Sequence, residues 1–523
     1  MPTLEWIGKD KVVNHHQQVP YRVLEAQYTY NAERSDNMII RGDNLEALKS
    51  LLPKYEGKVK CIYIDPPYNT GNEGWVYNDN VNDPRIKKWL GEVVGKEGED
   101  LSRHDKWLCM MYPRLKLLQK LLAENGAIFI SIDDVEMPNL RLLMDEVFGA
   151  GNFVTNVIWH KNYAPKSSAK YFSEDHDYIL VYAKNKSTWT PNLLPRTEDQ
   201  DKVYKNPDND PRGLWRPDNL SARNPYSLGK YSIVCPGGRI IPGPPAGRYW
   251  VVSEEKFKQM DAEGRIYWGK DGNNIPAPKR YLSEVKQGRV PQTIWEYADV
   301  GHTQDAKKDI KAIFDGEMPF DTPKPARLLE RIIQIASDAD GIILDSFAGS
   351  GTTAHAVLNM NKADGGNRKF ILVEMMDYSD AITAERVKRV IDGYGNGKNA
   401  VPGTGGDFTF YDLGEALLLP NGNLNENVSA DKIREYVYYM ETKEALPEGS
   451  NGNPYFLGAS HGAAYYFYYE KDAITTLDHG FLATIPERAD NYIIYADLCT
   501  IPTEELAKYN ITFKKIPRDI ARL

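Results

Sequence analysis

The sequence has few cysteines, no long apolar run and no excess of positive charge, and each absence excludes a class of protein. Its four cysteines among 523 residues lie far apart, which argues against a disulfide framework or a paired-cysteine zinc site and favours a reducing cytoplasm. No apolar run reaches the roughly 18 residues of a membrane span, and we see no secretory signal. The formal net charge of −9 argues against a uniformly basic nucleic-acid surface but allows a local basic cleft.

The dominant pattern is an alternation of strands and helices in two separate stretches, residues 35–189 and 321–395. In the first we expect strands at 38–40, 58–64, 127–132 and 178–182, and helices at 45–52, 108–122 and 137–147, with Asn125-Gly126 as a C-cap of the second helix. In the second we expect helices at 325–336, 352–358 and 381–391, and strands at 341–344 and 370–373. This alternation predicts an α/β fold, a Rossmann-like, mostly parallel sheet covered by helices.

The stretch between them has a different composition. Residues 190–295 hold 13 of the 32 prolines, 10 glycines and 11 aromatic residues, and 17 Lys and Arg against 12 Asp and Glu. Composition alone leaves open whether this is an irregular, turn-rich insertion or a recognition module built from loops. We therefore expect an N-terminal segment (1–34), an insertion (190–320), a glycine-rich linker (393–406) and a small α/β unit (407–523).

The first chemical motif follows the expected strand 58–64. It reads Asp65, Pro66, Pro67, Tyr68 and Asn69. The two prolines fix φ and remove two N–H donors, so a carboxylate, backbone carbonyls and an aromatic ring remain for a ligand. This set suits a planar group with an exocyclic amine, whose N–H groups would bond to Asp65 and the Pro66 carbonyl while Tyr68 stacks on the ring. A rigid turn after a strand is the alternative.

The second motif follows the expected strand 341–344 and opens a helix. Its candidate cofactor-binding residues are Asp345, Phe347, Ala348, Gly349, Ser350, Gly351 and Thr352. A glycine-rich turn at a helix N-terminus binds anionic or nucleotide ligands, and Glu374, at the end of the next strand, stands where an acid binds ribose. The spacing Gly349-x-Gly351-x-x-Ala354 also fits a dinucleotide fingerprint, so a nicotinamide-dependent oxidoreductase is a competing hypothesis.

An amine-holding site beside a nucleoside cofactor indicates methyl transfer from S-adenosylmethionine. Here the sequence resembles β-type DNA amino-methyltransferases, and most of all the modification (Mod) subunits of type III restriction–modification systems. Catalytic motif, recognition region and cofactor loop follow one another in the permuted order of that type. Besides both motifs, the resemblance includes residues 70–71, 77–79, 104–107, 112–115, 129–134, 177–182, 300–303 and 322–325.

The resemblance implies a role for each matching residue. Asp65, Pro66, Pro67 and Tyr68 would be catalytic, and Asp65 at the first motif position favours adenine N6 over cytosine N4. Phe347 and residues 349–352 would hold the methionyl part of the cofactor, Lys324 and Pro325 would close over it, and Glu374 would bind its ribose. Asp43 would reach the cofactor too, although a helix N-cap explains it equally well.

The resemblance also implies partners. We expect double-stranded DNA bound with base flipping, a homodimer, an ATP-dependent restriction (Res) subunit as a separate partner, no metal, and a prokaryotic cytoplasm close to the nucleoid. A stand-alone methyltransferase acting on adenine N6 or cytosine N4 is the alternative. The candidate DNA-binding residues are Arg212, Arg216, Arg223, Arg239, Arg248, Lys279, Arg280 and Arg289.

Overall fold

The computed structural model describes residues 3–69, 88, 92, 103–447, 452–486 and 488–520. They form two compact units, one made of Met1–Asn192 and Gln292–Leu523 and the other of Leu193–Pro291. The second unit is shorter than the insertion expected at 190–320, because the chain from Gln292 onward returns to the first unit. Residues 70–71 and 77–79 of the sequence resemblance lie outside the described residues.

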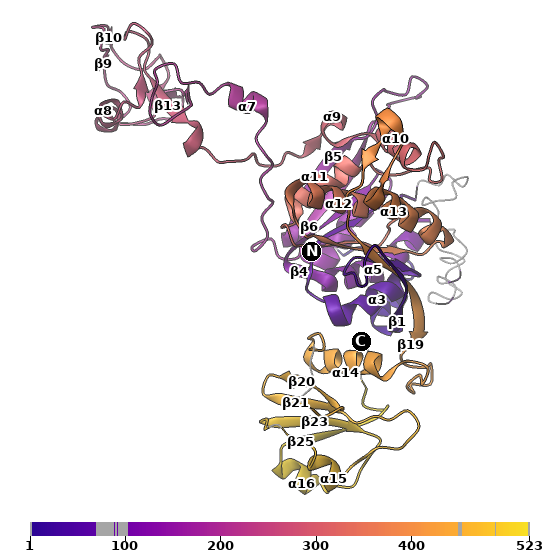
Figure 1. The fold of residues 1–523 in the computed structure, drawn as a ribbon. Helices are drawn as coiled ribbons and strands as arrows, with labels where there is room; N and C mark the ends of the chain where they lie inside the picture. The colour runs from indigo at the N-terminus through magenta and orange to yellow at the C-terminus, as the bar shows by residue number, and fades with distance from the viewer. Residues whose placement is uncertain are drawn as a thin grey trace. The chain divides into compact units, whose positions relative to one another are not determined.

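The largest sheet of the first unit among the described residues has ten strands (Figure 1). In spatial order its strands are β1 (Arg22–Tyr30), β19 (Phe408–Ala416), β2 (Met38–Arg41), β16 (Lys369–Glu374), β15 (Ile342–Asp345), β3 (Val59–Ile64), β4 (Leu122–Ile132), β6 (His176–Ala183), β5 (Phe153–His160) and β14 (Ile294–Trp295). The strands from β19 to β4 are parallel to their neighbours, whereas β1 and β6 run antiparallel to theirs. The expected α/β fold with a mostly parallel sheet is confirmed.

The central strands are buried along nearly their whole length, because helices cover both faces of the sheet. One apolar cluster contains residues of α1 (Lys9–Val12), α3 (Asn44–Tyr55), α5 (Arg103–Leu121) and α6 (Met137–Met144) together with the strand residues on one face. The helices α11 (Ala326–Ala336), α12 (Thr352–Asp364) and α13 (Glu385–Asp392) pack beside one another. The same unit also contains α2 (His15–Gln18), α9 (Tyr297–Val300) and α10 (Thr303–Ile313). None of the described helices has the length and apolarity needed to span a membrane.

One expectation about an element end is wrong. Helix α5 ends at Leu121 and β4 begins at Leu122, so Asn125 and Gly126 lie in a strand rather than at a helix C-cap. A Cβ on Gly126 would lie 3.0 Å from the Lys60 carbonyl oxygen, so this glycine allows close approach of β3 and β4. The expected linker 393–406 contains a short hairpin of β17 (Gly393–Tyr394) and β18 (Val401–Pro402).

The large sheet also extends beyond its expected limits. β1, inside the expected N-terminal segment, pairs with β19, inside the expected C-terminal unit. β19 in turn pairs with β2 in parallel. The two ends of the expected methyltransferase domain therefore both add strands to one edge of its sheet.

The remaining C-terminal residues form a small α/β layer structure, as the sequence predicts. Its sheet contains β20 (Phe456–Ser460), β21 (Ala463–Phe467), β23 (Asn491–Ala496) and β25 (Ile511–Lys515). Helix α14 (Ala430–Thr442) packs on one face, and α15 (His479–Leu482) and α16 (Thr503–Lys508) pack on the other. The strands β22 (Thr476–Leu477) and β24 (Leu498–Cys499) pair beside them.

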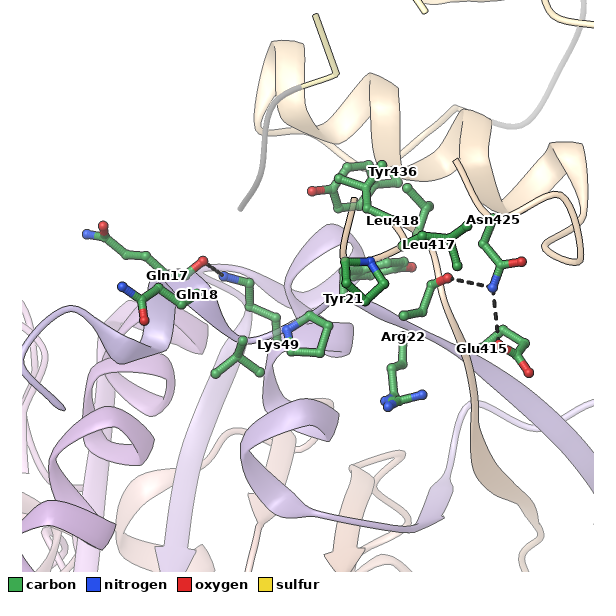
Figure 2. A pocket seen from close by; sticks show the side chains of 15 residues that line it. Gln17, Gln18, Tyr21, Arg22, Lys49, Glu415, Leu417, Leu418, Asn425 and Tyr436 are labelled. Carbon is green, nitrogen blue, oxygen red and sulfur yellow. Dashed lines mark hydrogen bonds between the residues drawn. The ribbon is translucent and has the colours of Figure 1, made fainter. Parts of the chain in front are cut away.

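A hollow of about 400 Å³ lies where the N-terminal segment, the end of β19 and α14 meet (Figure 2). On one side Lys49 Nζ donates hydrogen bonds to the carbonyls of His16 and Gln17. On the other, Asn425 Nδ2 donates to Glu415 and to the Ala416 carbonyl, as Figure 2 shows. The Asn425 bonds fix the chain as it leaves β19.

The second unit, Leu193–Pro291, is built mostly from turns and short strands. Its strands are β7 (Trp215–Pro217), β8 (Ser221–Ala222), β9 (Ile233–Val234), β10 (Ile240–Ile241), β11 (Tyr249–Trp250), β12 (Ile266–Tyr267) and β13 (Ala277–Tyr281). Its helices are α7 (Glu198–Lys202) and α8 (Glu254–Ala262). A small core centred on Trp250 and Phe257 holds it together.

Candidate active site

Both sequence motifs lie at one edge of the large sheet. β3 ends at Ile64, directly before Asp65, while β15 ends at Asp345 and β16 at Glu374. Since β3, β15 and β16 are parallel neighbours, their carboxyl ends open at the same edge. Ligands of open α/β sheets bind at this edge, so the topology places the amine-holding motif beside the glycine loop.

The first motif is held from two helices. Trp107 on α5 donates its Nε1–H to the Pro67 carbonyl at 2.6 Å, and Asn69 Nδ2 donates to Glu136 Oε1 at 2.5 Å. Glu136 is fully buried and also bonds to His104 Nδ1 at 2.6 Å and Asn139 Nδ2 at 2.8 Å. A buried carboxylate needs such partners, and this one fixes the turn that presents the motif. The resemblance includes 104–107 but gave these residues no role, and it missed Glu136.

The glycine loop between β15 and α12 has the backbone that only glycine adopts readily. Gly349 and Gly351 have φ of 53° and 81°, and a Cβ on Gly351 would lie 3.0 Å from the Thr383 carbonyl oxygen. Asp345 accepts hydrogen bonds from the Phe347 N–H at 3.0 Å and from Thr353 Oγ1 at 2.5 Å. Burial, followed by the charges of Asp65 and Glu374, raises the pKa of Asp345 to about 7.

Glu374 closes the loop from the next strand. Its Oε2 accepts the Gly349 N–H at 2.8 Å and its Oε1 accepts the Met376 N–H at 3.0 Å. The side chain is 3% exposed. The acid expected to bind ribose thus lies against the glycine loop.

A buried arginine that the sequence interpretation missed supports the loop from behind. Arg386, on α13, donates from one terminal nitrogen to Ser350 Oγ at 2.8 Å and to Thr352 Oγ1 at 2.7 Å. Its other terminal nitrogen lies 3.2 Å from His355 Nδ1. Burial lowers the pKa of this guanidinium to about 10, and the Asp309 charge opposes that shift. No sequence signal distinguishes Arg386 from the surface arginines of an amphipathic helix.

Asp43 serves as a helix cap, one of its two expected roles. Its Oδ1 accepts the N–H groups of Leu45 and Glu46 at the start of α3, and its Oδ2 lies 3.4 Å from Arg114. The next residue, Asn44, donates to the Ser346 carbonyl of the glycine loop at 3.2 Å. The capped helix therefore also touches the cofactor motif.

Lys324 contacts the first motif and lines the small hollow beside the glycine loop. Its Nζ lies 2.5 Å from Asp65 Oδ2 and 5.1 Å from the centre of the Tyr68 ring. The other carboxylate oxygen of Asp65 and the hydroxyl of Tyr68 are buried and have no hydrogen-bond partner among the described residues other than each other. Buried polar atoms of this kind are available to a ligand.

Two hollows share the wall made by residues 322–324. One, of about 20 Å³, is lined by Tyr63, Asp65 and residues of the glycine loop. The other, of about 420 Å³, is lined by Tyr68, Trp159, Lys161, Asp177 and Thr303. The first has room for little more than one water molecule. The second has the size of a small-molecule pocket.

The candidate DNA-binding residues all lie in the second unit, but several are used inside it. Lys279 has a 7% exposed side chain and pairs with Asp208 and Asp210 at 2.5 and 2.7 Å, and Arg212 pairs with Asp210 at 2.8 Å. Arg248 bonds to Ser221, Arg239 to the Asn273 carbonyl and Arg280 to Asp218. Arg216 and Arg289 are half-buried, whereas Arg223 is exposed.

Comparison with known proteins gives a family. A model described as DNA methylase matches residues 59–385. The chain is 39% identical over 390 residues to the type III restriction-modification enzyme StyLTI Mod subunit of Salmonella typhimurium, covering 71% of this chain and 57% of that protein. It is 34% identical to the EcoPI Mod subunit of Escherichia phage P1, covering 71% and 63%.

A further relative is the type II methyltransferase M.KpnI of Klebsiella pneumoniae, 32% identical over 67% of this chain and 85% of that protein. The match to each of these two Mod subunits spans less than two thirds of their length. These matches include both motifs and exclude the nicotinamide-dependent oxidoreductase that the glycine spacing also allowed. The resemblance is confirmed: this chain belongs to the DNA methylase family that includes type III Mod subunits.

Proposed function

We propose that this protein transfers a methyl group from S-adenosylmethionine to adenine N6 within a short, asymmetric sequence of duplex DNA, as the modification and recognition subunit of a type III restriction system. The observation that carries the proposal is the Asp65–Tyr68 turn next to the glycine loop, with Lys324 contacting both Asp65 and Tyr68. The three relatives, at 32 to 39% identity, support it.

The residues around the small hollow fit the cofactor. Its anionic carboxylate suits the N-terminus of α12, which begins at Thr352, and its ribose hydroxyls suit Glu374. Its cationic groups suit the buried carboxylate of Asp345. When bound, S-adenosylmethionine supplies an electrophilic methyl group. Lys324, Pro325 and Phe347 would enclose it, and Asp43 would act at a distance by capping α3.

The target base would occupy the larger hollow. Tyr68 offers a ring for stacking on the base. The Oδ1 of Asp65, which is buried and does not pair with Lys324, would accept a hydrogen bond from the exocyclic amine. The Pro66 carbonyl would accept the second N–H of that amine. Holding both hydrogens directs the nitrogen lone pair away from them, toward the cofactor side of the wall. The methylated nitrogen is acidic enough to release its proton without a strong base.

An adenine in a duplex cannot reach a pocket of this kind, so the base must leave the helix. Flipping costs a few kcal/mol, which stacking on Tyr68 and the hydrogen bonds to Asp65 would offset. Residues 193–291 would read the sequence, with exposed Arg223, Arg239 and Arg280 as the first candidates for contact. The C-terminal residues beyond β19 would supply contacts for a homodimer and for an ATP-dependent Res subunit.

A second candidate is a stand-alone methyltransferase without a nuclease partner. The match to M.KpnI, which covers 85% of that type II enzyme, favours it. Copurification of the expressed chain with a large ATP-dependent nuclease from its native host would support the type III assignment. A chain that purifies alone and protects DNA by itself would support the second candidate.

The central test is methyl transfer to DNA. Purified protein with tritiated cofactor should label plasmid DNA, and single-molecule sequencing should find N6-methyladenine at one short motif. Asp65→Ala should abolish labelling while cofactor binding persists, and the matched control Asp472→Ala, at an exposed C-terminal position, should label normally. Folded protein that labels no DNA would overturn the proposal, and N4-methylcytosine would overturn its adenine part.

A further inference from the structure

The connection between β5 and β6 carries the most exposed large apolar side chain among the described residues. In this aromatic loop, residues 161–175, Phe172 is 91% exposed, Tyr171 81% and Tyr163 64%. Adjacent exposed aromatic side chains bury a large apolar area when they find a partner. Neither the sequence motifs nor the proposed function gives this loop a role.

The loop is ordered by its own hydrogen bonds. Ser173 Oγ accepts the Lys166 N–H at 2.7 Å and donates to Asp175 at 2.6 Å. Asn162 Nδ2 donates to the Glu174 carbonyl at 3.0 Å. These bonds close the loop between residues 166 and 173 and leave Tyr171 and Phe172 exposed.

The base of the loop forms part of the target-base hollow. Lys161 and Asp177, on either side of the loop, line that hollow together with Tyr68 and pair with each other at 2.6 Å. Thr303, another lining residue, donates its N–H to the Lys161 carbonyl at 3.0 Å. Two residues separate Phe172 from Asp175, so their Cα atoms lie within about 11 Å of each other. The Asp175 carbonyl accepts the N–H of Lys161, which lines the hollow, at 2.9 Å, and this bond places the loop beside the hollow.

The charge of the loop suits DNA. Lys170 directly precedes the aromatic pair, with its Nζ 5.1 Å from the centre of the Tyr171 ring, and Lys166 lies four residues before Lys170. Apolar side chains that insert between base steps recur in DNA-bending proteins, where lysines beside them meet the phosphates. A protein partner would also bury the aromatic rings, but it would not explain their position at the mouth of a base pocket.

We propose that Phe172 and Tyr171 enter the duplex where the target base leaves it and stack on the remaining neighbours, so that the extrahelical base is favoured. This inference rests on the proposed DNA methylation and goes further by assigning the step to a loop outside the recognition unit. The loop fills the gap, while Tyr68 stacks on the base itself. Lys166 and Lys170 hold the adjacent phosphates.

The experiment uses the full chain and a duplex carrying 2-aminopurine in place of the target adenine, whose fluorescence rises when the base leaves the stack. Phe172→Ala, Tyr171→Ala and the double variant are compared with the wild type and with Tyr509→Ala, a half-exposed tyrosine in the C-terminal residues. Loss of one stacking aromatic should lower the fluorescence rise and the methyl-transfer rate on matched adenine duplexes by about tenfold. Cofactor affinity should stay unchanged.

A second substrate distinguishes an aromatic loop that enters the duplex from one that only stabilises the fold. When the target adenine is mismatched, extrusion costs less, so the variants should recover most of the wild-type rate on it. Normal fluorescence and rate on the matched duplex, or a loss that a mismatch does not relieve, would overturn the proposal. Wild-type protein that methylates no DNA would overturn the proposed function, and this inference with it.

Discussion

Lys324 Nζ lies 2.5 Å from Asp65 Oδ2, and this ion pair joins two segments that are more than 250 residues apart in the chain. Both side chains are mostly buried, with 13% and 18% of their surface exposed. Lys324 also lines both the hollow of about 20 Å³ and the hollow of about 420 Å³. The ion pair therefore links segment 322–324 to the turn that carries Asp65.

Lys324→Met should lower methyl transfer by about ten- to hundredfold, because Asp65 loses the cation that orients it inside a buried site. Lys324→Arg keeps the charge and should retain more activity. A double-mutant cycle with Asp65→Asn, read as transfer rates, should give a coupling of about 1 to 3 kcal/mol. Additive losses would show that the two residues act independently.

Glu136→Ala should slow methyl transfer while leaving cofactor affinity near its wild-type value. The substitution leaves Asn69 and His104 without their shared acceptor and releases the turn that presents Tyr68. We expect a loss of stability of about 2 to 3 kcal/mol, measured by urea unfolding, because hydrogen bonds to a buried charge are removed. Glu136→Gln preserves the shape and should rescue part of the rate. An unchanged rate with lower stability would show that Glu136 acts on the fold alone.

Arg386→Met should weaken cofactor binding, because Ser350 and Thr352 lose the donor that fixes the glycine loop. Calorimetric titration should show a drop in affinity of about tenfold or more. Arg389→Ala is the matched control, since Arg389 lies on the same helix but pairs with Glu385 and Asp315 at the surface. Equal effects of the two substitutions would contradict a specific contribution of Arg386.

Cofactor binding should release a proton near neutral pH. The pKa of Asp345 is about 7, because burial favours its neutral form, so the stability due to this group is present below about pH 4 and is lost as pH rises through 7. A cationic cofactor favours the ionised form, so affinity should increase from pH 6 to pH 8. The binding enthalpy should depend on the ionisation heat of the buffer, and Asp345→Asn should remove this dependence. A proton count that Asp345→Asn leaves unchanged would contradict the assignment.

The arginines and lysines of the second unit should divide into two groups. Arg223→Ala should weaken DNA binding and lower the salt dependence of the affinity by about one unit of slope if it contacts a phosphate. Lys279→Met should instead destabilise the unit, because Asp208 and Asp210 lose their shared cation. Filter binding across a salt series and thermal unfolding measure the two effects. Stable Lys279→Met protein with weakened DNA binding would reverse the division.

The sequence by itself determined the fold class and the chemistry of the two motifs. Their signals are local: a proline pair fixes the turn after β3, and glycines at 349 and 351 supply the positive φ that the next loop requires. Buried parallel strands also read as continuous apolar runs, so their positions were predicted closely. These features depend only on residues adjacent in the chain.

The tertiary structure alone decided which distant residues support the site. Glu136 and Arg386 look like ordinary charged residues on helices, and only burial beside the two loops turns their charges into fixed hydrogen-bond partners. The same holds for β1 and β19, whose pairing no local pattern indicates. A long-range contact produces no recognisable local sequence pattern in the two segments that form it. The sequence therefore determined the chemistry of the site, and tertiary packing determined what holds it in place.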